Sequence, residues 1–277
     1  MEPYTQNIRP ASVAGLFYPA DKLMLERELS LMLENAPVLE PPRPIRGLIV
    51  PHGGFLYSGG VAARAYRQII DQPCEGIVLI APPHESTLYF TAVYSGKAFR
   101  TPLGDVQVNQ QLASKLVDLE PTCKLSEQGF EEGEYTIEVQ LPFVQWVQDG
   151  VPILPIMMGR QDREAVEKLT QALLQLAKNR QLLFIASTDL SQNHPDTLAR
   201  RMDQVCISHI ERFDPDGLLQ DVEQGACEMC GSGPAVVVMK LCQALGATQA
   251  RVLLYRNSAD ITGERDKVVG YLSAIFY

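Results

Sequence analysis

The chain has 277 residues, of which 46% are hydrophobic and 21% are charged, and its formal net charge at pH 7 is −9. This composition is ordinary for a globular protein, and the length fits one large domain or two small ones. The acidic balance argues against general binding to nucleic acid or to an anionic membrane, because such binders usually carry basic patches. No apolar run approaches the roughly 18 residues that a membrane-spanning helix needs.

The N-terminal residues show no basic start followed by an apolar core, so no secretory signal is recognised and a cytoplasmic location is expected. The cysteines have scattered spacing, and a disulfide framework is therefore not expected in a reducing compartment. They are Cys74, Cys123, Cys206, Cys227, Cys230 and Cys242.

Short apolar runs alternate with amphipathic segments along the chain. Residues 1–20 are expected to be an extended entry segment, and the proline-rich stretch 38–47 is expected to be a loop. The periodicity predicts, in order, a helix at 21–36, a strand at 47–50, a helix from Ser58 to Ile70, strands at 76–81 and 151–159, a helix at 162–179, a strand at 181–186, a helix at 233–246, and two strands within 250–277.

This alternation indicates an α/β fold with a largely parallel or mixed central sheet that is flanked by helices on both faces. The last two strands are expected to form a hairpin or an edge pair that completes the sheet. No internal repeat and no linker divides the chain, so a single domain over residues 1–277 is expected.

Polar residues follow three of the predicted strands: His52, His84 and Asp189. In sheets of this kind, ligands bind outside the carboxyl ends of the strands. Each histidine could ligate a metal or carry a proton, or it could simply be a hydrogen-bonded loop residue. No short spacing such as HExxH links His52 with His84, so the fold must bring them together if they share a metal.

Cys227 and Cys230 form a single CxxC motif just before the predicted helix 233–246. One CxxC does not make a four-cysteine zinc site. A thiol near a helix N-terminus has a lowered pKa, so Cys230 suits a soft metal ligand or a reactive thiol. The alternatives are an inert buried cysteine and a thiol-redox pair with Cys227.

The acidic segment 131–138 could supply a general base or a carboxylate that orients a histidine, although such clusters are more often solvated loops or helix starts. Asp189 could orient a ligand or a catalytic group, or it could cap the next turn. His194 could equally be a surface residue or a site residue, and His209, which lies on a predicted helix, most simply has a structural role.

No P-loop, GxGxxG or GxSxG motif is present, so nucleotide-binding and α/β-hydrolase functions have no support.

Taken together, the motifs resemble the Memo-like family, which includes the Memo component of the AmmeMemoRadiSam system. The stretches that carry the resemblance are RPASVAGLFYP, VPHGGFLYSG, PPHES, TPLGDVQV, EYTIEVQLPFVQ, PIMMG, STDLS, CGSGP and DKVVGYLSAIFY. The resemblance implies a fold similar to that of class III extradiol dioxygenases, in which two histidines and a carboxylate hold a non-haem iron. In Memo-like proteins a cysteine stands in place of the carboxylate. Matched by motif, the metal ligands here are His52, His84 and Cys230.

The resemblance therefore implies one iron, copper or zinc ion, with Glu134, Tyr135, Asp189 and Gln192 as candidate catalytic residues. The sequence departs from the family pattern at two of these positions. Gln192 stands where the family often has a histidine, and Tyr135 stands where a second pocket histidine is common. Glutamine cannot shuttle protons, whereas Tyr135 could if its pKa were lowered.

Two functions follow from these observations. The favoured one is a metal-binding or partner-binding protein on an inherited enzyme fold, because the histidines are missing at 135 and 192. The alternative is a dioxygenase-like or other metal-dependent redox enzyme that acts on a small substrate. For partners, the resemblance implies an AMMECR1-like protein and a radical SAM protein.

Overall fold

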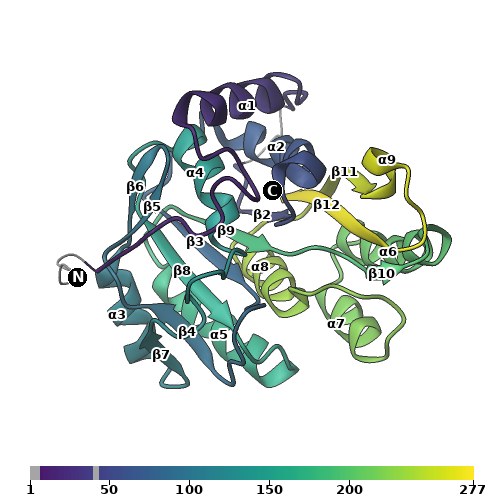
Figure 1. Ribbon diagram of the computed structural model, residues 1–277. Coiled ribbons are helices and arrows are strands. Elements are labelled where there is room, and N and C mark those ends of the chain that lie inside the picture. Colours follow the sequence, from purple (N-terminus) through teal and green to yellow (C-terminus); the bar gives the residue numbers. More distant parts are fainter. Residues whose placement is uncertain (1–6, 40–43) are drawn as a thin grey trace.

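The computed structural model describes residues 7–39 and 44–277. A nine-stranded mixed sheet dominates the molecule, with the strand order β10-β12-β2-β9-β3-β8-β4-β7 and with β11 beside β12 (Figure 1). The four middle strands are parallel to one another: β2 (Gly47–Val50), β9 (Leu182–Ser187), β3 (Gly76–Ala81) and β8 (Ile153–Met158). The predicted α/β fold with a parallel or mixed central sheet is therefore confirmed.

Antiparallel pairs extend the sheet on both sides of these four strands. On one side lie β12 (Val268–Phe276), β11 (Ala250–Asn257) and β10 (Gln192–His194), and on the other lie β4 (Thr91–Tyr94) and β7 (Cys123–Ser126). The C-terminal strands β11 and β12 form the expected antiparallel hairpin, and β12 pairs with β2. A second sheet of three strands contains β1 (Ile8–Arg9), β5 (Ala98–Thr101) and β6 (Gly104–Gln107).

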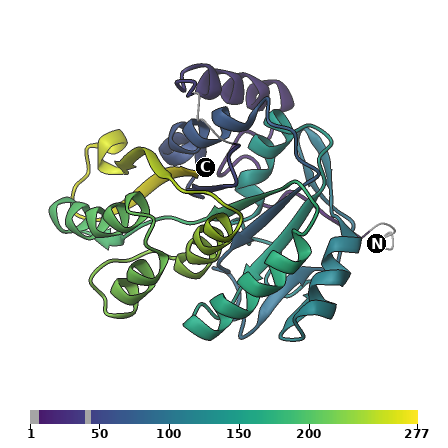
Figure 2. The ribbon, with the colours of Figure 1, turned by 180° about the vertical axis from the view of Figure 1, so that it is seen from behind.

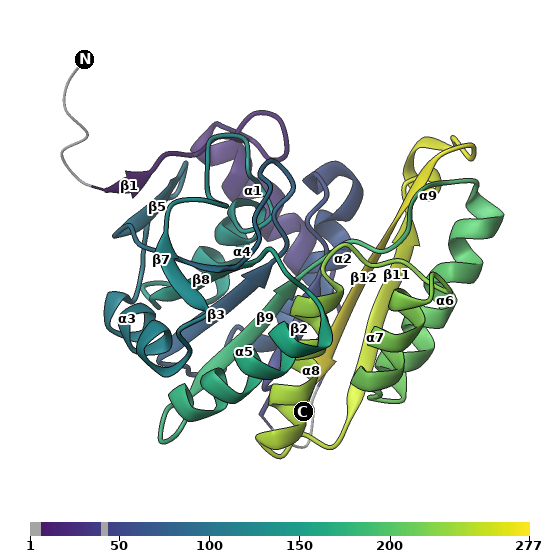
Figure 3. The same ribbon diagram turned by 90° about the horizontal axis from the view of Figure 1, so that it is seen from below.

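Helices cover both faces of the large sheet (Figure 3). One face carries α3 (Gln110–Leu119), α5 (Arg163–Leu176), α6 (Asp196–Glu211), α7 (Pro215–Glu223) and α8 (Ser232–Ala244). The opposite face carries α1 (Lys22–Glu34), α2 (Gly60–Tyr66) and α4 (Leu141–Val147). The short α9 (Ala259–Thr262) lies between β11 and β12. Viewed from behind, α5 and α8 lie side by side over the sheet (Figure 2).

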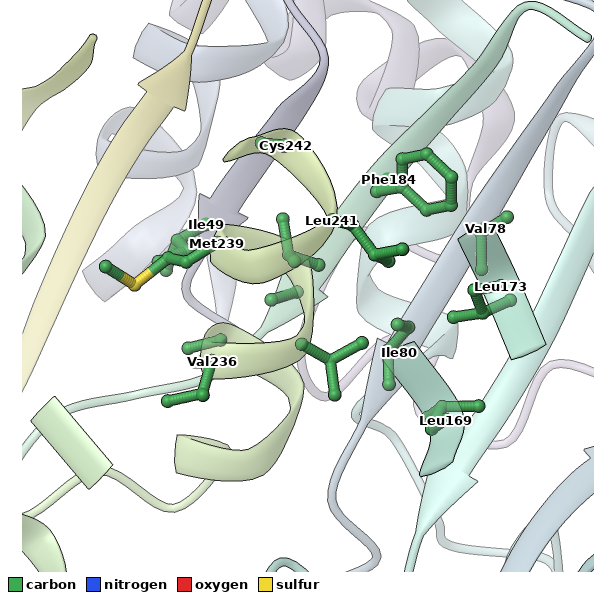
Figure 4. Packing of buried hydrophobic residues seen from close by; sticks show 14 of the residues in the cluster. Ile49, Val78, Ile80, Leu169, Leu173, Phe184, Val236, Met239, Leu241 and Cys242 are labelled. Carbon is green, nitrogen blue, oxygen red and sulfur yellow. The ribbon is translucent and has the colours of Figure 1, made fainter. Parts of the chain in front are cut away.

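Alternating side chains of the middle strands fill two separate cores. Val78 and Ile80 of β3 face the core under α5 and α8, whereas Ile77 and Leu79 face the core under α2 and α4. Figure 4 shows the first core, in which Val236 of α8 and its neighbours pack on the strands. Because successive side chains of a strand point to opposite faces, a strand buried on both faces must be apolar throughout.

Helix boundaries follow from local chemistry where a cap is present. The side chain of Asp21 accepts the N–H of Met24 at the start of α1, and that of Asp162 accepts the N–H of Ala165 at the start of α5. The predicted helix Ser58–Ile70 is divided into a short π-helix (Phe55–Gly59), α2 and a 3-10 turn (Arg67–Ile69).

The predicted entry segment and proline-rich loop fall partly outside the described residues, at 1–6 and 40–43. Where described, the entry segment is more than an extended lead-in, because Ile8 and Arg9 pair with β5. The sequence patterns did not single out β4 to β7, α3, α4 or α7. Within residues 7–39 and 44–277, no helix has the combination of length and hydropathy that crossing a bilayer would require.

Candidate metal centre

His52, His84 and Cys230 meet at the carboxyl-end edge of the parallel strands. Nε2 of His52 lies 3.2 Å from Nε2 of His84 and 3.4 Å from Sγ of Cys230. All three potential ligand atoms lie within 4.8 Å of one another. His52 is fully buried, Cys230 is half-buried and His84 is exposed, so the cluster opens to solvent on the His84 side.

Topology explains why the two histidines converge. His52 follows β2 and His84 follows β3, and both strands run parallel to β9, which lies between them. Their carboxyl ends therefore share one edge of the sheet, as the strand-end positions predicted. Neither glycine after His52 is required by a left-handed backbone, because Gly54 has φ −58° and Gly53 is also outside the positive-φ region. Gly53 is needed instead for close approach, since a Cβ there would lie 2.8 Å from the ring of Tyr271.

Cys230 is held against the end of β9 by backbone contacts. The N–H of Asp189 donates to Sγ of Cys230 at 3.3 Å, and the N–H of Cys230 donates to the Asp189 carbonyl at 3.3 Å. The next residue, Gly231, donates its N–H to Oγ1 of Thr188 at 2.8 Å. A Cβ at Gly231 would lie 2.7 Å from the carbonyl oxygen of Ser187, so only glycine allows this approach.

The carboxylate of Asp189 supports the backbone of His52. Oδ1 of Asp189 accepts the backbone N–H of His52 at 2.9 Å. Oδ2 of Asp189 lies 3.9 Å from Nε2 of the His52 ring. Burial raises the pKa of Asp189 to about 7, while hydrogen bonds from the His52 and Gly53 backbones act in the opposite direction. Asp189 thus lies beside the cluster and holds the backbone of His52.

Glu134 fixes the loop that carries His84. Its Oε2 accepts the N–H groups of His84 at 2.6 Å and of Glu85 at 3.1 Å. Its Oε1 accepts the N–H groups of Tyr135 and Thr136 and the Thr136 hydroxyl. This carboxylate, 1% exposed, is fully engaged with donors, which is the arrangement expected of a residue that orients a histidine loop.

Tyr135 lies beside both histidines, with its ring centroid 5.8 Å from that of His52 and 5.6 Å from that of His84. Its pKa is raised by burial and then by the nearby Asp189 and Cys230, not lowered as proton shuttling would require. The phenol therefore keeps its proton at neutral pH and is not poised to act as a base.

Gln192 is on β10, and its backbone N–H lies 3.5 Å from the carboxylate of Glu228. The imidazole of His194 pairs with the same carboxylate at 2.8 Å. Glu228 precedes Cys230 by two residues, so β10 is joined to the segment that carries the thiol.

His209 is on α6, as predicted. Its two ring nitrogens contact Asp214 and Asp221, so its role is structural.

Burial determines the protonation of the three clustered side chains. It lowers the pKa of His52, where the charge of His84 acts in the same direction, and partial desolvation of the more exposed His84 lowers the pKa of that residue against the effect of Glu134 and Glu85. Burial and then the charge of Asp189 raise the pKa of Cys230 to about 12. The expected thiolate-favouring effect of the helix start is therefore outweighed, and the free cluster contains two neutral imidazoles and a thiol.

The other cysteine of the CxxC motif is not among the clustered ligand residues. Cys227 is buried, and the neighbouring Cys206 lowers the pKa of its thiol. No disulfide joins the cysteines within the described parts of the chain.

The two separations that involve Nε2 of His52 fit a tetrahedral metal ion. For ordinary metal–nitrogen and metal–sulfur bond lengths, tetrahedral geometry places two nitrogens about 3.3 Å apart and a nitrogen and a sulfur about 3.6 Å apart. The observed separations of 3.2 Å and 3.4 Å are close to these values. Three protein ligands leave one position for water or a small molecule.

Sequence reasoning missed Thr136 and Gln140, which contact Ser187 beside His52, although it had named Glu134 and the acidic segment that includes Glu138. These four residues occupy every second position of the EYTIEVQ stretch, and each is at most 1% exposed. Ser187, also missed, lies at the end of β9 and contacts His52. The available signal was a polar residue at each alternate position within an otherwise apolar stretch.

Comparison with known proteins agrees with the motifs. A family model described as Memo-like protein matches residues 9–275. MEMO1 family proteins of Methanothermobacter thermautotrophicus, Aquifex aeolicus and Methanosarcina barkeri are 33%, 35% and 36% identical to this chain, respectively. The three alignments cover 95%, 97% and 97% of this chain and 98%, 99% and 99% of the relatives.

Among solved structures, an uncharacterized protein of Escherichia coli K12 has a similar fold, with a TM-score of 0.54 and 14% identity over 84% of this chain and all of the other. At this identity the likeness concerns the fold alone. The family is established by the sequence matches, which extend over nearly the whole length of the chain. The chain belongs to the Memo-like protein family.

Proposed function

We propose that the protein binds one transition-metal ion through His52, His84 and Cys230. The observation that carries the proposal is the convergence of Nε2 of His52, Nε2 of His84 and Sγ of Cys230 within 4.8 Å of one another, with His52 at distances from the other two that suit a tetrahedral ion. Two imidazoles and one thiolate are ligands for iron, copper or zinc, and the thiolate favours softer ions than a carboxylate would. When bound, the ion would supply Lewis acidity or, for iron or copper, redox chemistry.

The residues around the ligands favour metal handling or partner binding over dioxygenase chemistry. Tyr135 stands beside both histidines, and burial keeps its phenol protonated, so it supplies no base at neutral pH. Glu134 is saturated by donors, and Asp189 holds the His52 backbone. These side chains position ligands, while a second imidazole for proton transfer is missing at 135 and at 192.

Metal analysis of protein purified without added metal tests this function. We expect about one equivalent of iron, copper or zinc in the parent protein and its loss in His52→Ala and Cys230→Ser. His194→Gln and Cys74→Ser are matched controls, because His194 pairs with Glu228 and Cys74 precedes β3 at the opposite end of the strands. Equal metal content in the parent and in both ligand variants would exclude the three-residue site.

A dioxygenase-like enzyme is the second candidate, and the exposure of His84 supports it, since a small molecule could reach the metal from that side. Oxygen uptake by the iron-loaded protein in the presence of catechols tests it, and uptake no faster than that of Cys230→Ser would exclude it.

An AMMECR1-like protein and a radical SAM protein are proposed as partners from the family resemblance. Affinity copurification with each of them tests that proposal.

A further inference from the structure

Ser187, the last residue of β9, is at the centre of a buried hydrogen-bond network behind His52. Its Oγ donates to the backbone carbonyl of Thr136 at 2.7 Å and lies 3.1 Å from Nδ1 of His52. The side-chain amide of Gln140 donates to the same Oγ at 2.9 Å. All four residues are fully buried, so their polar atoms depend on partners within the protein.

Two further contacts fix the orientation of the Gln140 amide. Its nitrogen also donates to the backbone carbonyl of Pro51 at 2.9 Å, and its oxygen accepts the phenol of Tyr66 at 2.9 Å. A flipped amide would place its oxygen against the Pro51 carbonyl, where neither atom can donate. The atom of Gln140 that faces Ser187 is therefore the nitrogen, which can only donate.

These contacts leave one consistent protonation pattern for the ring of His52. A serine hydroxyl has one proton and two lone pairs. The proton of Ser187 goes to the Thr136 carbonyl, and one lone pair accepts from Gln140. The other lone pair faces Nδ1 of His52, so Nδ1 must carry the ring proton and donate it to Ser187.

We propose that Ser187 is a positioning residue that holds His52 in its Nδ1–H tautomer, with Thr136 and Gln140 fixing the direction of the serine hydroxyl. In this tautomer the free lone pair is on Nε2, the atom that faces His84 and Cys230. The inference rests on the proposed metal site and deepens it, because it explains which nitrogen of His52 is available as a ligand.

Gln140 holds His52 in two ways. Through the Pro51 carbonyl it fixes the backbone immediately before the histidine, and through Ser187 it fixes the ring. Partners of this kind keep a metal-ligating histidine in orientation and raise its basicity, and their loss typically weakens metal binding by about 10- to 100-fold.

The test is nitrogen-15 NMR of metal-free protein with labelled histidine, in which the His52 signals are assigned by their loss in His52→Gln. We expect a protonated, pyrrole-type Nδ1 and an unprotonated, pyridine-type Nε2. In Ser187→Ala we expect a mixture of tautomers and metal binding about 10- to 100-fold weaker, while Ser187→Thr, which retains the hydroxyl, keeps the parent tautomer.

Ser191→Ala is the matched control, because Ser191 is buried on the same segment, and among the described residues its hydroxyl makes no hydrogen bond to His52, His84 or Cys230. It should change neither the tautomer nor the affinity. A pyridine-type Nδ1 in the parent protein, or an unchanged tautomer in Ser187→Ala, would overturn the inference. If Ser187→Ala does not fold, Ser187→Cys provides the test instead. Cysteine sulfur is a weak hydrogen-bond acceptor, so this variant should show a mixture of His52 tautomers.

The outcome is separable from that of the metal analysis, because the tautomer is observed without metal. A parent protein that shows the Nδ1–H tautomer but binds no metal supports the positioning role of Ser187 and contradicts the proposed metal-binding function.

Discussion

The carboxylate of Glu134 accepts the backbone N–H of His84 at 2.6 Å, across 50 residues of sequence. The same carboxylate accepts N–H groups from Tyr135 and Thr136, so it joins the loop after β3 to the turn before α4. This contact explains how an exposed histidine can be held beside a buried one.

We expect Glu134→Gln to weaken metal binding by about 10- to 100-fold and to destabilise the fold by about 1–3 kcal/mol. The reason is that the glutamine nitrogen would face backbone donors where a carboxylate oxygen now accepts them. Chelator competition and urea unfolding measure the two effects. Glu132→Gln, an exposed residue of the same acidic segment, should change neither, and equal effects of the two substitutions would contradict a specific role for Glu134.

Gly231→Ala should displace Cys230 from the end of β9. The added Cβ would lie 2.7 Å from both the Ser187 carbonyl oxygen and Cβ of Thr188, which are not free to move without shifting the strand end. We expect a loss of about 1–3 kcal/mol in the free energy of unfolding together with reduced metal content.

Gly60→Ala is the control for this substitution, because Gly60 begins α2 and a Cβ there would meet no atom within 4 Å. It should be neutral or slightly stabilising, by up to about 1 kcal/mol. Full metal content in Gly231→Ala would show that the close approach is not required for the thiol to reach the cluster.

Metal binding should release about one proton at neutral pH. The pKa of Cys230 is raised to about 12, so the free thiol is protonated, whereas the lowered pKa values of His52 and His84 keep both rings neutral. Because the metal replaces the thiol proton, affinity should rise roughly tenfold per pH unit between about pH 7 and 9.

Calorimetric titration in two buffers of different protonation enthalpy measures this proton release directly. Cys74→Ser should release the same number of protons as the parent protein. Metal binding at neutral pH without proton release would mean that Cys230 is already a thiolate or does not ligate.

Asp189 should make the metal-free protein less stable as the pH rises from about 4 to 7. Its folded pKa, about 7, lies above the value of 3.8 that is usual for an aspartate carboxyl group. In that window the unfolded chain has lost the proton that the folded protein still holds, so the free energy of unfolding falls with rising pH, by up to about 4 kcal/mol.

Urea unfolding at pH 5 and pH 8 measures this dependence. Asp189→Asn keeps an oxygen that can accept the His52 N–H, and it should flatten the decrease. Asp266→Asn, at an exposed position, should behave like the parent protein. If Asp189→Asn and the parent protein lose the same free energy of unfolding between pH 5 and pH 8, a group other than Asp189 causes the pH dependence.

Local sequence pattern predicted the elements that build the sheet edge. The apolar runs at 47–50, 76–81 and 181–186 became β2, β3 and β9, because a strand buried on both faces must be apolar at every position. Residues that directly follow such strands are placed at the ligand-binding edge by topology alone, so His52, His84 and Asp189 could be selected before any contact was known.

The tertiary structure decided what each of those residues touches and how it is protonated. His52 and Cys230 are 178 positions apart, and Ser187 and His52 are 135 apart, so no local spacing encodes either contact. Burial raises the pKa of Cys230, although the helix start had indicated a lowered value, and it raises the pKa of Tyr135, where proton shuttling would have required a lowered one. Desolvation depends on every atom packed around a group, and therefore only the assembled fold determines which nitrogen, thiol and hydroxyl face the metal position.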